Sequence, residues 1–121
     1  MNYTNTISEE YVASGILKQP EKVIPMLKAD GFTEEYFHKG ATKLVWKTAI
    51  KMVDDGKVSD IRTMEHSDEV RGVDHDGHLY NDIVRLKGNW GGFERLKNHV
   101  QTVKEYRSIR FADKALSDVT L

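Results

Sequence analysis

The sequence has 121 residues, the usual size of one domain, and its 39% hydrophobic and 31% charged residues exclude a wholly disordered chain. It contains no cysteine, which excludes a disulfide scaffold, a cysteine-ligated zinc site and a cysteine nucleophile. Residues 1–10 lack the apolar core of a signal peptide, and no run reaches the ~18 apolar residues of a membrane span. We therefore expect a cytoplasmic protein that does not contact a membrane.

The net charge is −1, and it is unevenly distributed. Residues 1–84 hold 10 Lys and Arg against 15 Asp and Glu, whereas residues 85–121 hold 8 against 4. A mildly basic C-terminal arm on an acidic body favours self-association or an acidic partner surface. The bias is too small to predict nucleic-acid binding by itself.

The first part of the chain predicts three short elements. A helix is expected from about Ile7 to Leu17, because Thr6 and Glu9 have the spacing of a capping box. Its inward face would consist of Tyr11, Val12, Gly15 and Ile16. A second helix follows Pro20 and stops at Gly31. Residues 32–37 form a turn or a single helical turn whose aromatic side chains enter the core.

Apolar residues at helical spacing predict a third helix over residues 39–55, ended by Gly56. One outer face of this helix carries four lysines: Lys39, Lys43, Lys47 and Lys51. Such a row is typical either of a face that follows a phosphate backbone or of an ordinary solvated surface. We favour the solvated surface.

Ser59 or Asp60 can cap a further helix, with Ile61, Met64 and Val70 inward. Residues 71–77 are polar and predict a loop, after which residues 78–87 predict a helix. The apolar side of that helix would carry Leu79, Tyr80, Ile83, Val84 and Leu86.

Residues 92–119 predict a final helix roughly 40 Å long. The short connector at 88–92 implies that this helix and the preceding one form an antiparallel hairpin. We thus predict one all-α domain, with a helical globule of four to five short helices over residues 1–77 and a hairpin over 78–121. A helix of this length exceeds what one small globule can cover, so its apolar stripe predicts a contact with another molecule.

Chemical motifs are sparse. The segment from Asp74 to His78 holds two histidines and two aspartates, including His75, and is the best candidate for a metal site. We prefer a polar loop, because no helical histidine pair supports it. The chain has no phosphate-binding loop and no spacing that suggests a catalytic triad. We expect neither an enzyme nor a metal or cofactor.

Two features of the C-terminal region suggest a partner. Trp90 lies in a glycine-rich turn, where it either folds back onto Phe93 or Tyr80 or forms an exposed anchor. Arg107 and Arg110 lie where the apolar stripe weakens, and they are either solvated or bonded to carboxylates of a partner.

Several of these features occur in a familiar order over about residues 8–115. An acidic helix start with an apolar-Gly-apolar run stands at Glu9–Leu17, and further motifs are Tyr36-Phe37, Lys43-Leu44-Val45-Trp46, Ala49-Ile50, Gly56–Asp60, and Val103-Lys104-Glu105 with Arg110. In this order the chain resembles the N-terminal domain of DnaB-type replicative DNA helicases of bacteria and phages. It departs from the family pattern at Thr42, where the family usually has a histidine, in its connector, and over residues 65–78.

The resemblance implies a non-catalytic domain of a hexameric ATP-dependent helicase, from which the ATPase part is absent here. In that family, hairpins pair between subunits, and the resulting collar docks primase or a helicase loader, with weak or no direct DNA contact. Carried over to this chain, the self-association or partner-binding residues would be Trp90, Phe93, Leu96, Val100, Val103, Tyr106, Arg107 and Arg110. Alternatives are the helicase-binding domain of a primase, a stand-alone replication adaptor and a small basic nucleic-acid-binding protein.

Overall fold

A computed structural model describes residues 6–37, 40–74 and 76–119 of the chain, with side chains described as far as residue 112. Within these ranges the chain forms six α-helices, two 3-10 segments and no strand, which confirms the predicted all-α class. In chain order the elements are α1 (Thr6–Lys18), α2 (Pro20–Ala29), η1 (Glu34–Tyr36), α3 (Gly40–Asp54), η2 (Val58–His66), α4 (Asp68–Arg71), α5 (His78–Lys87) and α6 (Phe93–Val119).

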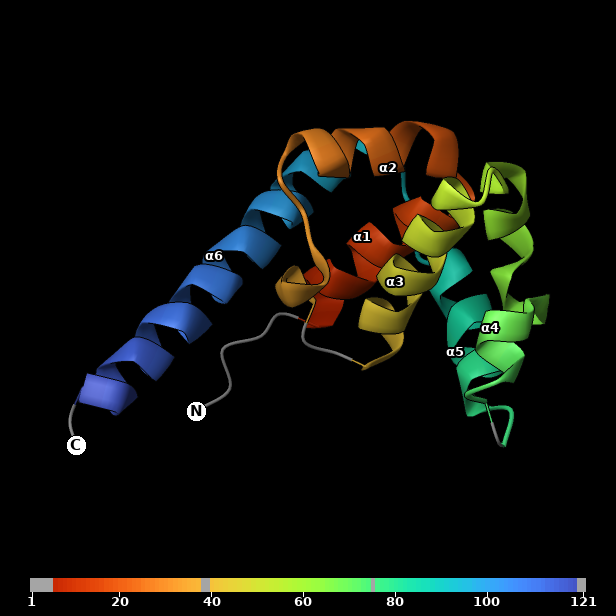
Figure 1. Ribbon diagram of the computed structural model, residues 1–121. Helices are drawn as coiled ribbons and strands as arrows, with labels where there is room; N and C mark the ends of the chain where they lie inside the picture. The colour runs from red at the N-terminus through yellow and green to blue at the C-terminus, as the bar shows by residue number, and fades with distance from the viewer. Residues whose placement is uncertain (1–5, 38–39, 75, 120–121) are drawn as a thin grey trace.

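Helix α1 lies at the centre of the fold (Figure 1). Every residue from Tyr11 to Leu17 is buried, so α1 is covered all around and not on one face only. Helices α2, α3, α5 and α6 and segment η2 pack against it. A helix whose circumference is apolar or small throughout is the one expected inside a globule. The four residues predicted to face inward are all buried, and they form part of a larger covered surface.

Helix α3 begins and ends within one residue of the predicted bounds. Val45, Ala49 and Met52 are buried as expected. Trp46 is also buried, although the helical period did not assign it to the core. Its ring lies 6.2 Å from Phe32 and 6.1 Å from Phe37, between ring centroids. The segment around η1 therefore covers a side of α3 that the period of α3 alone would leave open.

The predicted helix after Ser59 is two elements. Ile61, Met64 and Val70 are buried as predicted, but residues 58–66 form the 3-10 segment η2, with non-helical backbone at Thr63. The hydroxyl oxygen of Ser67 then accepts a 3.3 Å hydrogen bond from the amide of Val70, which starts helix α4. The N-cap at Ser67 is the local signal that divides this stretch.

Helix α5 has the predicted bounds, but its apolar face is narrower than expected. Ile83 and Leu86 are buried and Leu79 is half-buried, whereas Tyr80 and Val84 are exposed. The packing partners of α5 are α1, α3 and η2. Because these partners approach from one side, only a narrow stripe of α5 is covered.

The predicted hairpin between α5 and α6 is not present. Helix α5 packs with the globule, and α6 packs against α1 and η1, so the two helices lie on opposite sides of α1 (Figure 1). The short connector does bring the end of α5 close to the start of α6. Both helices, however, bury their apolar stripes against the enclosed helix α1 and not against each other. Consequently the expected boundary at residue 77 does not separate a globule from a hairpin.

Helix α6 is the longest element, with 27 residues. Its first half lies against α1, and its second half continues past the globule to the C-terminal end of the described chain (Figure 1). No helix within the described residues has the length and hydropathy to cross a membrane.

Candidate interaction surface

The first half of α6 presents a buried seam, formed by Leu96, Val100 and Val103. The helix buries these residues, at spacings of four and three, against α1. Burial of each side chain is worth roughly 1.5–3 kcal/mol. These three residues were predicted to line a hairpin or a subunit contact. They instead belong to the core of the single chain, because α1 occupies the place expected for a second hairpin helix.

Trp90 folds back onto the chain. Its ring centroid lies 5.2 Å from that of Phe93 in an edge-to-face arrangement and 5.5 Å from that of Tyr11. The indole also lies directly over Gly15, where an added Cβ would be 2.7 Å from Trp90 Cζ3. Trp90 is half-buried, and Phe93 is exposed. Of the two alternatives for Trp90, the structure shows packing on Phe93, while Tyr80 is not its neighbour.

A polar cluster fastens α6 to α1. The ring of His99 stacks on Tyr11 at 4.3 Å, and its Nδ1 lies 2.8 Å from the hydroxyl oxygen of Ser8. Tyr11 donates a 2.7 Å hydrogen bond to the carbonyl of Gly92, at the start of α6. Burial lowers the pKa of His99, and the positive charge of Arg95 lowers it further. The cluster therefore favours a neutral imidazole. The sequence shows no signal for it, because its members are more than 80 residues apart.

The two arginines of the long helix are held by segment η1. Arg107 forms a 3.0 Å ion pair with Glu35, and its guanidinium lies 5.1 Å from the ring centroid of Tyr36. Arg110 donates a 3.4 Å hydrogen bond to the carbonyl of Glu35. Both arginines thus bind groups of the same chain. Tyr106, also predicted to meet a partner, is half-buried.

Near these arginines α6 exposes two large apolar side chains, Ile109 and Phe111, which we call the distal patch. They are two residues apart on the helix, so they point to different sides of it. Ile109 is 44% exposed and Phe111 is 62% exposed. The guanidinium of Arg107 covers one face of Phe111 at 4.7 Å from the ring centroid. Leu116 and Val119 continue the helical spacing of apolar residues in the sequence, but their side chains lie outside the described part of the chain. Neither Ile109 nor Phe111 was among the predicted partner-binding residues; of those, Phe93 is the one that the structure leaves exposed.

A groove of about 660 Å³ separates α2 from the first half of α6. Its apolar lining includes Met26, Phe93 and Val100, and its polar lining includes Lys97 and Lys104. Met26, on α2, is 41% exposed. The sequence could not place α2 beside α6, because residues 30–92 lie between them.

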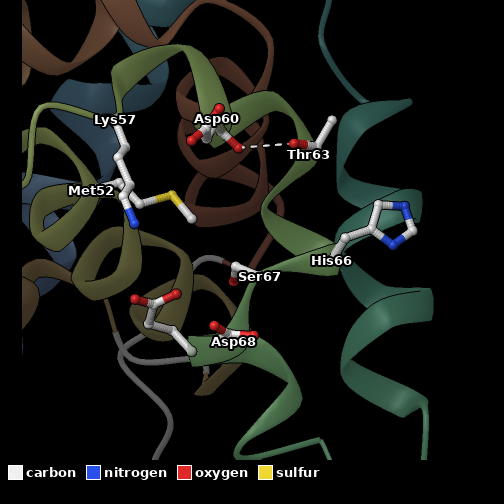
Figure 2. Close-up of a pocket in the computed structure, with 8 residues that line it drawn as sticks. Met52, Lys57, Asp60, Thr63, His66, Ser67 and Asp68 are labelled. Atoms are coloured by element: carbon white, nitrogen blue, oxygen red, sulfur yellow. Dashed lines mark hydrogen bonds between the residues drawn. The ribbon is translucent and has the colours of Figure 1, made fainter.

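A polar pocket of about 280 Å³ lies between the end of α3 and η2 (Figure 2). Figure 2 shows the imidazole of His66 pointing away from Met52 and Lys57, and its centroid is 5.5 Å from the ring of Tyr80. Thr63 donates a 3.2 Å hydrogen bond to the carbonyl of Asp60, as the dashed line marks. Thr63 and Ser67 bond to local backbone groups, and Glu69 pairs with Lys51, so these side chains are engaged outside the pocket.

The candidate metal loop forms the start of helix α5. The carboxylate of Asp74 accepts hydrogen bonds of 3.0 Å from the amides of Leu79 and Tyr80, two of the free donors at a helix N-terminus. Asp76 accepts a bond from the amide of His78 and lies 3.3 Å from its ring nitrogen. His75 lies outside the described residues. Among the residues that are described, no group of three or more His, Asp or Glu side chains could hold a metal ion.

The lysine row of α3 is partly engaged within the chain. Lys47 pairs with Glu34 at 3.7 Å, and Lys51 pairs with Glu69 at 3.3 Å. Lys39 lies outside the described residues, and Lys43 is half-buried. Because carboxylates lie beside these lysines, this face is less suited to bind a phosphate backbone than the row of lysines alone suggests.

No protein-family model matches the sequence, and neither a curated protein nor a solved structure matches it.

Proposed function

We propose that this chain is a non-catalytic protein-interaction domain that assembles through the distal patch of α6. The observation that carries the proposal is the division of α6 into two halves. Its first half is bound by α1, whereas the distal patch carries two large apolar side chains on a helix that extends past the globule. Full burial of an exposed Ile or Phe contributes roughly 1.5–3 kcal/mol, and these side chains, which are already partly covered, would contribute about half of that each.

Within this class, we assign the chain to the N-terminal domain of a hexameric replicative helicase, which would support subunit assembly and docking of primase or a helicase loader. The support is the ordered set of motifs from Glu9–Leu17 to Arg110. The packing of α6 moves the proposed subunit contact away from Leu96, Val100 and Val103, which are buried within the chain. It moves the contact to Ile109 and Phe111, farther along the same helix.

The mass of the chain in solution tests the assembly proposal. Light scattering coupled to size exclusion, at concentrations from about 10 μM to 1 mM, should detect a dimer or a larger species. Ile109→Gln and Phe111→Gln should each weaken association by about tenfold, because they remove apolar surface that is exposed in the monomer. Ser108→Gln is the matched control on an exposed neighbouring position and should associate like the parent.

Two results would contradict this proposal. One is a strict monomer at the highest concentration. The other is association that persists in both the Ile109 and the Phe111 variant when their helix content is unchanged.

The helicase assignment has its own test, since the gene should also encode an ATPase domain with a phosphate-binding loop. A gene that encodes a primase core instead would favour the helicase-binding domain of a primase.

A further inference from the structure

The groove between α2 and α6 has the dimensions of a site for a protein segment. Its volume is about 660 Å³, the largest among the cavities described above. Leu27 and Val100 form a buried floor, while Met26 and Phe93 are both 41% exposed at its sides. Large apolar side chains that remain half-open beside a buried floor are typical of a groove that accepts apolar anchors.

The ring of Phe93 is fixed in place by the chain itself. Trp90 contacts it edge-to-face at 5.2 Å, and the ammonium of Lys22 lies 5.7 Å from its centroid. This end of the groove is consequently preorganised, which reduces the entropy that is lost when a partner binds.

The rim of the groove is positively charged. Lys97, Gln101 and Lys104 follow one another along α6 at spacings of four and three, so they form one polar row on one face of the helix. Lys104 pairs with Asp30 at 3.1 Å, and Asp30 is the single carboxylate among the residues that line the groove. Lys97 forms no ion pair with any described residue. Among the lining residues two lysines therefore stand against one aspartate, and the ammonium of Lys22 lies nearby, over the ring of Phe93.

These observations identify the kind of partner. We propose that the groove binds an amphipathic helix of a partner protein. The apolar side chains of that helix would pack on Met26 and Phe93, and its acidic side chains would face Lys97 and Lys104. The two lysines are seven residues apart, or about 10 Å along α6. A partner helix that lies along α6 would match them with two acidic residues at the same interval.

The apolar floor distinguishes this partner from nucleic acid. A phosphate backbone would use the lysines but would leave Met26 without an apolar contact. Phe93 is the single aromatic residue that lines the groove, so the groove lacks the successive aromatic platforms on which bases stack. The inference rests on the proposed function as an interaction domain, and it adds the position and the chemistry of the docked partner.

Titration with synthetic peptides tests the proposal. The probe is a helical peptide of about 18 residues, roughly 27 Å long. It carries Leu at i, i+3, i+4 and i+7 and Glu at two positions seven residues apart. One control peptide has both Glu residues replaced by Lys, and a second has its Leu positions scrambled. Binding is followed by amide chemical shifts of the isotope-labelled chain.

The acidic peptide should give saturable shifts that cluster at residues 26–30 and 93–104, and both control peptides should bind at least tenfold more weakly. Lys97→Glu should weaken binding of the acidic peptide by about three- to tenfold, most at low salt. Met26→Ala should weaken it by about fivefold or more. Lys57→Glu reverses a charge outside the groove and should leave the affinity unchanged.

Three outcomes would overturn the proposal. They are no saturable shift with the acidic peptide at about 1 mM, equal binding of the lysine peptide, and competition by a single-stranded oligonucleotide at the same residues. The self-association test uses the distal patch and a different measurement. If the chain self-associates but its amide shifts do not respond to the acidic peptide, the groove proposal is wrong and the assembly proposal still holds.

Discussion

Gly15 and Trp90 are in direct contact across the fold: a Cβ at residue 15 would be 2.7 Å from Cζ3 and 3.3 Å from Cε3 of the indole. An isolated Gly to Ala change inside a helix normally stabilises by about 1 kcal/mol. Here we expect Gly15→Ala to destabilise the chain by about 1–3 kcal/mol, because the methyl group must displace a packed ring. Urea unfolding measures the change.

The contact between Gly15 and Trp90 can be tested by a double-mutant cycle. In a Trp90→Leu background, the smaller side chain removes the steric conflict, so Gly15→Ala should become neutral or stabilising. A Gly15→Ala variant that is as destabilised in the leucine background as in the parent would show that the conflict lies elsewhere in α1.

The two halves of α6 should differ in their sensitivity to truncation. Leu96 is 1% exposed and lies in the core, so Leu96→Ala should cost about 2–5 kcal/mol of unfolding free energy. Ile109 lies in the distal patch, and Ile109→Ala should cost less than about 1 kcal/mol in a dilute monomer. Thermal unfolding of both variants at low concentration compares them. Equal losses would mean that the distal half is covered by the globule.

The cluster around His99 should make stability depend on pH. Burial, followed by the charge of Arg95, lowers the pKa of His99 from its ordinary value of about 6.5. The unfolded chain therefore binds more protons than the folded chain between the two pKa values, and stability rises with pH in that window. The contribution is complete above about pH 6.5 and is lost as the pH falls through the folded pKa.

His99→Gln isolates this contribution. The variant should show a flatter dependence of unfolding free energy on pH than the parent between about pH 7 and 5.5. Backbone hydrogen bonding lowers the pKa of Glu21 and Glu69, with added help from Arg62 and Lys51, respectively. The stability that Glu21 and Glu69 contribute is lost only as the pH falls below about 4.5, the ordinary pKa of a glutamate. This pH range lies below the range in which His99 acts. Identical pH profiles for parent and variant would exclude His99 as the source.

Glu65 and Lys87 form the most buried ion pair described in the chain, at 2.6 Å. The second carboxylate oxygen of Glu65 is buried and has no hydrogen-bond partner among the described protein groups. Lys87→Met should therefore cost about 3 kcal/mol or more, because it leaves a buried carboxylate without its cation. The double variant Glu65→Met with Lys87→Met should recover most of that loss. Calorimetry of the set measures it, and no recovery would contradict the explanation.

Local features of the sequence were sufficient to predict most of the helices. The bounds of α5 and the long span of α6 follow from apolar spacing and from glycines that interrupt it, because both act within one or two helical turns. The division at Ser67 was missed, although a serine N-cap is a local signal. The sequence also showed that Leu96, Val100 and Val103 form an apolar face of α6. It did not show that α1 covers this face.

The partners of each face were decided by tertiary structure alone. Hydrophobic periodicity says which side of a helix avoids water, and it contains no information about which distant element covers that side. For this reason the sequence did not show that α5 and α6 pack on α1 and do not form a hairpin. It also did not show that Trp90 packs on Gly15, 75 residues earlier in the chain. The same long-range packing bound Arg107 to Glu35, left Ile109 and Phe111 open, and created the groove beside Met26.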